Sequence, residues 1–160
     1  MERLPLQPAW ALLAAFLLAS SATGADEAPS KNKQQPAPPC TLSGTWVNDL
    51  GSRMVISAAN AAGVFSGSYL TAVSSANQAI AESALQGAQH DPAQDAQPTF
   101  AFTVRWAFSD SATAFVGQCF VDQHGEETLE TLWLLRQNVP SRSEDWKATR
   151  VGKNVFTRVK

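Results

Sequence analysis

Hydrogen-bonding side chains occur among large aromatic side chains on one predicted face of the chain. The polar members are Asn48, Tyr69, Thr71, Thr113 and Asn154, and the aromatic members are Trp106, Phe108, Phe115 and Trp133. A buried polar group without a partner costs about 1–3 kcal/mol. Such a set therefore predicts a polar ligand, ordered water or a mouth open to solvent, unless the polar residues pair with one another at strand ends. We interpret the pattern as a cavity for a small molecule.

The elements that must position these side chains are β-strands, because apolar residues recur at every second position, as at Phe100, Phe102 and Val104. Strands are predicted at 41–48, 53–58, 64–71, 80–89, 99–108, 113–119, 129–135 and 146–159, with turn signals between them. No segment has a convincing helical period. The pattern predicts an all-β fold, an eight-stranded antiparallel up-and-down β-barrel, with a β-sandwich as the alternative. A barrel of about eight strands has room for side chains or one small ligand.

The charge balance excludes two classes of partner. The chain has 160 residues, with 12 Lys and Arg against 14 Asp and Glu, and a net charge of −2. No basic block is present. We therefore expect no nucleic-acid partner and no binding to an anionic membrane.

Residues 1–24 have the order of a secretory signal peptide. Arg3 precedes an apolar run at 10–19, and small or weakly polar residues follow at 20–25. The run is too short to span a bilayer, which needs about 20 apolar residues. We expect cleavage near 24/25 and a secreted, extracellular protein. A flexible proline-rich segment is then expected at 25–39, ahead of one domain at 40–160.

Secretion changes the interpretation of the two cysteines. In an oxidising compartment Cys40 and Cys119 are expected to form one disulfide, and two free thiols or an intermolecular bridge are the alternatives.

The sequence offers no catalytic or metal-binding pattern. His90 and His124 are predicted in loops, and neither has a partner at metal-ligand spacing. No Gly-x-Ser-x-Gly turn occurs. We therefore expect no enzyme activity, no metal and no cofactor.

Several segments resemble the avidin family. They are CTLSGTWVNDLGS at 40–52, GSYLTAV at 67–73, QPTFAFTVRW at 97–106, GQCF at 117–120, TLWLL at 131–135 and DWKATRVGKNVFTR at 145–158. Together they cover essentially all of 40–160, in order. The resemblance implies a high-affinity biotin-binding protein that sequesters or stores biotin without catalysis. A lipocalin-like carrier of another small ligand is the alternative.

The resemblance also implies how the ureido group of biotin would be bound. Asn48, Ser52 and Tyr69 would donate to its oxygen, and Thr71 and Asn154 would accept from its two N–H groups. Three donors on one carbonyl draw charge onto the oxygen and strengthen each bond.

The remaining implied site residues surround the ring, the sulfur and the tail of biotin. Those expected at the ring and its sulfur are Trp106, Phe108, Thr113, Phe115, Trp133 and Leu135. Those expected at the carboxylate are Ser74, Ser75, Ala76, Ser109 and Ser111. Asp49, next to Asn48, is expected to orient that amide, and a simple turn residue is the alternative.

Trp146 is implied to act in a neighbouring subunit. In the family the matching residue covers the ligand of an adjacent barrel, which implies a homotetramer built as a dimer of dimers. A cap on its own barrel is the alternative. Leu132, Leu134, Val151 and Val155 are predicted on the outer face, and an exposed apolar patch supports assembly independently.

Two positions depart from the family pattern. Ala76 replaces a hydroxyl-bearing residue, although Ser75 adds one beside it. Little affinity is lost if backbone N–H groups bind the tail of the ligand, and affinity for the tail falls if side chains bind it. Lys153 replaces an apolar residue where two barrels meet. We expect repulsion between copies of Lys153 to weaken that contact.

Overall fold

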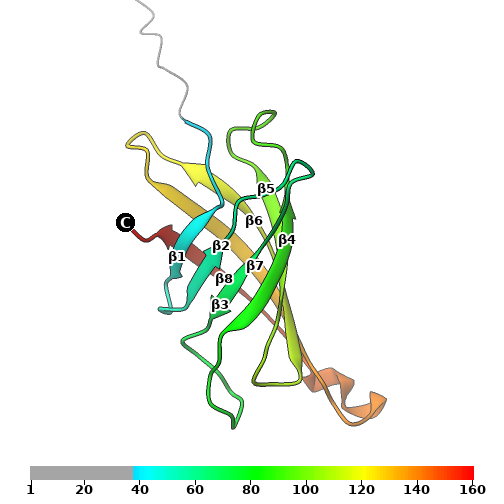
Figure 1. The fold of residues 1–160 in the computed structure, drawn as a ribbon. Helices are drawn as coiled ribbons and strands as arrows, with labels where there is room; N and C mark the ends of the chain where they lie inside the picture. The colour runs from blue at the N-terminus through cyan, green and yellow to red at the C-terminus, as the bar shows by residue number, and fades with distance from the viewer. Residues whose placement is uncertain (1–37) are drawn as a thin grey trace, which may run out of the picture. The chain divides into compact units, whose positions relative to one another are not determined.

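The computed structural model describes residues 38–160, so the predicted signal peptide and nearly all of the predicted proline-rich segment lie outside the described residues. The elements in chain order are β1 Gly44–Asn48, β2 Arg53–Ile56, β3 Val64–Leu70, β4 Ser83–Gln89, β5 Thr99–Arg105, β6 Ser111–Val121, β7 Glu127–Gln137, the 3₁₀ helix η1 Arg142–Lys147 and β8 Thr149–Arg158 (Figure 1). Among these residues no helix is long and apolar enough to cross a membrane.

The strands form one closed antiparallel barrel in sequence order. Each strand pairs with the next, and β8 returns to β1 through the pairs Trp46 with Arg158, Val47 with Thr157 and Asn48 with Phe156. This arrangement confirms the predicted up-and-down barrel and excludes the sandwich. Closure leaves no free sheet edge between the first and last strands.

Alternation along each strand builds the interior. On β5, Phe100, Phe102 and Val104 are buried whereas the residues between them are exposed. Opposite them, Phe102 stacks on Phe115 of β6 with ring centroids 4.6 Å apart. The apolar core occupies the half of the barrel that lies away from η1, and the polar side chains of interest follow it along the same inner face.

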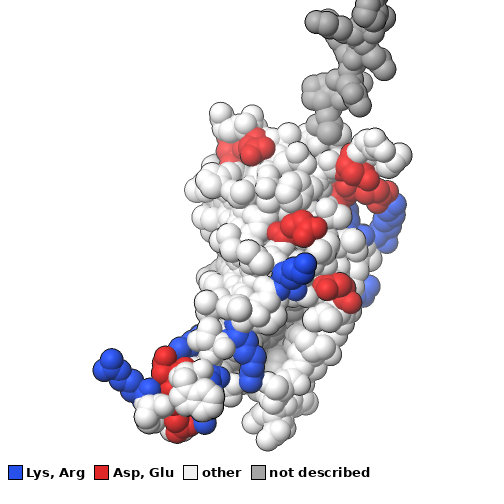
Figure 2. All heavy atoms as spheres, turned by 180° about the vertical axis from the view of Figure 1, so that it is seen from behind, with Lys and Arg blue, Asp and Glu red and all other residues white. Residues whose placement is uncertain are grey.

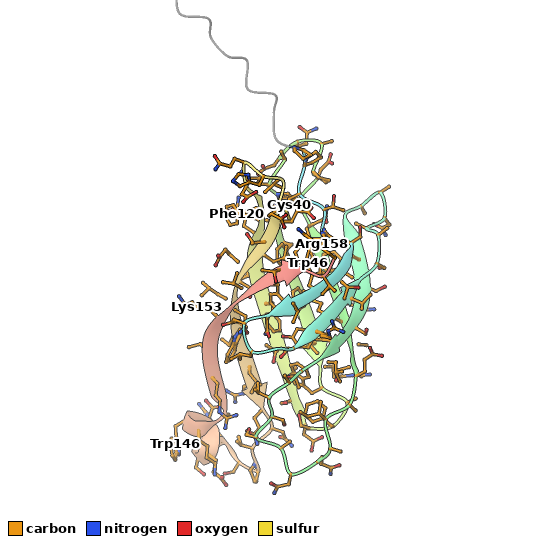
Figure 3. The ribbon with its side chains drawn as sticks, turned by 90° about the vertical axis from the view of Figure 1, so that its left-hand side faces the viewer. Cys40, Trp46, Phe120, Trp146, Lys153 and Arg158 are labelled. Carbon is orange, nitrogen blue, oxygen red and sulfur yellow. A yellow bond between two sulfur atoms is a disulfide. The ribbon has the colours of Figure 1, made fainter. Side chains whose placement is uncertain are left out.

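A disulfide and a partly exposed arginine lie at the end of the barrel nearest residue 38. Cys40 and Cys119 form the predicted disulfide, with Cα atoms 5.8 Å apart and 79 positions of sequence between them. In the chain-entropy account a loop of that length stabilises the fold by about 4–5 kcal/mol. Arg158 lies over the Trp46 ring, 4.3 Å from its centroid, and pairs with Glu127 (Figure 3).

The structure corrects several predicted element bounds. The segment 146–159 is not one strand, because 142–147 forms η1 and β8 begins at Thr149. Ser141 is in the extended conformation before this turn, and Glu144 and Lys147 pair along it, so no alternating pattern operates there. Trp106 and Phe108 lie beyond the end of β5 in the following turn rather than on the strand.

Candidate functional site

A cavity of about 570 Å³ opens at one end of the barrel. Figure 1 shows that η1, the β3–β4 connection and the β5–β6 turn lie at this end. With the exception of Trp146, every residue predicted to contact the ligand lines it. These residues are Asn48, Ser52, Tyr69, Thr71, Ser74, Ser75, Ala76, Trp106, Phe108, Ser109, Ser111, Thr113, Phe115, Trp133, Leu135 and Asn154. The barrel therefore gathers side chains from both ends of the sequence around one space.

The turn after β1 fixes the orientation of the Asn48 amide. Its Oδ1 accepts hydrogen bonds from the backbone N–H groups of Leu50 (3.0 Å) and Ser52 (2.8 Å). The amide nitrogen, which can only donate, is therefore turned away from that turn and lies 3.4 Å from the Tyr69 hydroxyl.

Ser52 and Tyr69 retain hydrogens that they can donate. The Ser52 Oγ accepts the backbone N–H of Ala72 at 3.0 Å, which leaves its own hydrogen free of that bond. Burial, together with the nearby charge of Asp49, raises the pKa of Tyr69 to about 12, and the Ser52 hydroxyl partly offsets this. The phenol is thus a neutral donor at physiological pH. Asn48, Ser52 and Tyr69 together form a set of three donors.

Thr71 and Asn154 have the opposite role. The Thr71 hydroxyl donates to the carbonyl of Val73 at 2.8 Å, so towards the cavity its oxygen can only accept. The Asn154 Nδ2 donates to Asp49 Oδ1 at 2.8 Å. The amide oxygen of Asn154 therefore remains available to accept a hydrogen bond from a ligand. Each acceptor is oriented by a hydrogen bond to another group of the protein, the Val73 carbonyl for Thr71 and the Asp49 carboxylate for Asn154.

The contact of Asp49 differs from the expected one. Asp49 bonds Asn154, 105 positions away, and not the adjacent Asn48, whose amide oxygen is already held by the turn. The Asp49 backbone N–H donates to Val155 at 3.2 Å, which places the residue beside β8. Asp49 therefore orients an acceptor on the last strand.

Aromatic rings form the side walls. Tyr69 packs edge-on against Trp106 and nearly parallel to Phe115, with centroids 5.4 and 5.7 Å apart. The Trp106 indole N–H donates to the Thr113 hydroxyl at 2.8 Å. Trp133 lies against β8 where Gly152 has no side chain, since a Cβ there would overlap the indole. These contacts fix the rings before any ligand enters.

Hydroxyl groups surround the mouth. Ser74 accepts the backbone N–H of Ala76 at 3.0 Å, and the hydroxyls of Ser109 and Ser111 lie 2.6 Å apart. Ala76 lines the cavity as predicted but offers no hydroxyl there.

Sequence reasoning missed six residues of the lining: Leu50, Val73, Asp110, Gln137, Asn138 and Arg150. Two of them follow from the period of the strands, since Gln137 lies two residues beyond Leu135 and Arg150 lies two residues before Gly152. The predicted strand at 129–135 ended before Gln137, and the predicted strand at 146–159 began within the 3₁₀ turn that precedes Arg150, so neither residue was identified as part of the lining.

Trp146 does not line the cavity of its own chain. It projects from η1 with 82% of its surface exposed (Figure 3). A side chain of this size exposed to that degree makes little contact with its own barrel, so the alternative of a local cap is not supported.

No group of three or more His, Cys, Asp or Glu side chains able to hold a metal occurs between residues 38 and 160. His90 lies in the connection after β4, where its Nδ1 is 2.6 Å from the Thr99 hydroxyl.

Comparisons with known proteins agree on one family. The model of the Avidin family matches residues 36–159. The chain is 54% identical over 121 residues to avidin of Gallus gallus, an alignment that covers 76% of this chain and 80% of that protein. It is 56% identical over 120 residues to avidin-related protein 4/5 of the same organism, covering 75% of this chain and 79% of that protein.

Solved structures give the same answer. The biotin-binding protein from chicken superposes with a TM-score of 0.72 at 63% identity, covering 76% of this chain and 98% of that one. Xenavidin superposes with a TM-score of 0.72 at 47% identity, covering 76% of this chain and 99% of that one. With a matching fold and a matching sequence over nearly all of residues 38–160, the chain belongs to the avidin family.

Proposed function

We propose that this protein binds biotin, one molecule per chain, with high affinity and without chemical turnover, and that it sequesters or stores the vitamin. One observation carries the proposal: the donor and acceptor roles of five polar side chains match the ureido group. Asn48, Ser52 and Tyr69 would donate to the ureido oxygen, and Thr71 and Asn154 would accept from the two N–H groups. A urea has one acceptor oxygen and two N–H groups, so every polar atom of the group finds a partner.

The rest of the ligand fits the remaining lining. The apolar faces of the fused rings would lie among Trp106, Phe108, Phe115 and Trp133, which removes apolar area from water at about 25 cal/mol per Å². Thr113, whose oxygen already accepts the Trp106 N–H, keeps a hydrogen to direct at the sulfur. The carboxylate would lie among the mouth hydroxyls and the backbone N–H groups of the β3–β4 connection.

A lipocalin-like carrier is the weaker candidate, because an apolar ligand would offer no partner to the donors and acceptors that these five side chains turn towards the cavity.

The proposal includes a homotetramer in which Trp146 covers the ligand of a neighbouring barrel. Two features support it: the exposure of Trp146 and an apolar outer face. On that face Leu132 and Val151 are 63% and 72% exposed, and Leu134 and Val116 lie beside them. Figure 2 shows acidic and basic side chains together at the end that carries η1, and further charged side chains spaced across the middle of the same face. An exposed apolar patch of this kind marks an interface.

The proposal also places the mature protein outside the cell. The Cys40–Cys119 disulfide requires an oxidising compartment to persist, and the first 24 residues have the order of a signal peptide.

Titration calorimetry of the mature protein with biotin tests the proposal. We expect heat release that saturates at one biotin per chain, quenching of tryptophan fluorescence, and recovery of unchanged biotin afterwards. Displacement of a biotin-mimicking dye by biotin distinguishes a biotin-binding protein from a carrier of apolar ligands. Absence of both heat and quenching would refute it.

A further inference from the structure

Two charged side chains, Asp110 and Arg150, line the cavity at its mouth. The neighbouring cations are already neutralised: Arg136 pairs with Asp145, and Lys147 pairs with Glu144. Within residues 38–160 the structure gives Arg150 no ion pair. It is therefore a cation at the entrance whose charge is not balanced by a direct contact.

The position of Arg150 follows from the start of β8. Arg150, Gly152 and Asn154 alternate along the strand and share the inner face, and Arg150 pairs in register with Leu135 of β7. Asn154 lies deep in the cavity and Gly152 lies beneath Trp133, so Arg150 is the member of this row that reaches the rim.

The serine hydroxyls at the mouth cannot distinguish a charged ligand tail from an uncharged one. A hydroxyl both donates and accepts, so Ser74, Ser109 and Ser111 can form hydrogen bonds with a carboxylate and also with an uncharged amide. A guanidinium only donates and carries a full charge, so it favours an anion over a neutral group of the same shape. The charge of Asp110 acts in the opposite sense.

We propose that Arg150 is a specificity-determining residue that favours ligands with a free carboxylate tail over the same ligands with an amide-linked tail. This inference rests on the proposed binding of biotin. In chemical terms, the site distinguishes the free acid from conjugates in which the carboxyl group is joined to an amine.

The expected effect is moderate, because Arg150 is exposed to solvent and its field is screened. An exposed ion pair contributes about 0.2–1 kcal/mol, which corresponds to about a 1.4- to fivefold preference, and low ionic strength favours the upper part of that range. Part of it should be in the association rate, since a charge at an entrance attracts the opposite charge before contact.

The experiment compares biotin with biotinamide, in which the carboxylate is a carboxamide, on the full mature protein at low and high ionic strength. Variants Arg150→Gln and Arg150→Lys test the charge. Arg105→Gln is the matched control, because Arg105 lies at the same end of the barrel but outside the cavity lining.

We expect Arg150→Gln to lower the ratio of biotin to biotinamide affinity about two- to fivefold at low salt, and less at high salt. Arg150→Lys should restore most of the ratio, and Asp110→Asn should raise it. Arg105→Gln should leave it unchanged.

The outcomes distinguish the role of Arg150 from the binding of biotin itself. If Arg150→Gln and Arg105→Gln alter the ratio equally, or Arg150→Gln leaves it unchanged, the assignment of Arg150 is wrong while biotin binding stands. If the unmodified protein binds neither compound, the proposed function itself fails.

Discussion

Replacing Tyr69 by Phe removes one buried oxygen and leaves the ring. The side chain is 3% exposed, and its ring is held by Trp106 and Phe115. Within the protein the hydroxyl accepts one long hydrogen bond, 3.4 Å from Asn48 Nδ2. The substitution therefore tests the donor to the ureido oxygen with little change in packing.

The magnitude follows from the number of donors. An ordinary neutral hydrogen bond contributes about 1 kcal/mol, whereas one to a charged atom contributes about 1.5–3 kcal/mol. Three donors on one oxygen shift charge onto it, so we expect the loss to lie in the second range, about ten- to hundredfold in Kd. The stability of the free protein should fall by less than about 1 kcal/mol, because the internal bond is long.

Displacement calorimetry of biotin with Tyr69→Phe and Asn48→Ala measures the effect. Ser68→Ala is the control, since it removes a hydroxyl from the adjacent position of β3 that bonds Glu82 outside the cavity. We expect no change in affinity for the control. If both cavity variants lose less than about 1 kcal/mol, the three donors do not act on one oxygen and the reasoning is wrong.

Ionisation of the same hydroxyl supplies an independent check. Tyr69 is the only tyrosine of the chain, so an ultraviolet difference titration reports it alone. Its pKa is raised from 10.0 to about 12, which means that the folded state holds the proton more tightly than the unfolded state. The associated stability is fully present below pH 10 and is lost as the pH rises through 12. It amounts to about 2–3 kcal/mol. A midpoint near 10 in the folded protein would show that the phenol is not a buried donor.

Three further substitutions test the surroundings of the site. Trp146→Lys should weaken biotin binding and subunit association together, and unchanged mass by light scattering with unchanged affinity would contradict the shared role. Lys153→Ile should raise the thermal midpoint of the assembly without altering biotin affinity. Lys153 has no ion pair within the described residues and lies in register with Leu132. If Lys153→Ile leaves subunit dissociation unchanged, or makes the subunits dissociate more readily, the expected repulsion is refuted. Asp49→Ala should weaken biotin binding by about 1 kcal/mol, because the Asn154 amide loses its anchor, and should lower the pKa of Tyr69 in the same titration.

The barrel was predictable because its signal is local. A period of two and frequent turn residues identify the strands, and eight strands in sequence order close without crossovers. Strand ends are less predictable, since pairing extends them beyond the alternating core. Ser111 and Gln137 are paired at the open end, so β6 and β7 both run past the predicted limits of 113 and 135.

The lining of the site was predictable from strand faces and from the family resemblance, but its internal hydrogen bonds were not. Proximity in sequence suggested that Asp49 serves Asn48, whereas closure of the barrel brings Asp49 to Asn154 on the last strand. Contacts across the β1–β8 seam depend on register and on strand tilt, and no local pattern encodes them. Arg150 was missed for a related reason, because the strand that carries it was assigned together with a 3₁₀ turn.

Orientation before binding is the property that connects the fold to the proposed affinity. The Asn48 oxygen, the Ser52 oxygen and the Thr71 hydroxyl are each held by backbone groups of neighbouring turns, and Asn154 is held by Asp49. Ordering a mobile side chain on binding costs about 0.5–1.5 kcal/mol, and here that cost is met during folding. A closed barrel with a disulfide at its far end keeps these turns in place. A substitution that removes one of these orienting hydrogen bonds, but keeps the side chain that faces the cavity, should therefore weaken biotin binding even though every donor and acceptor remains present.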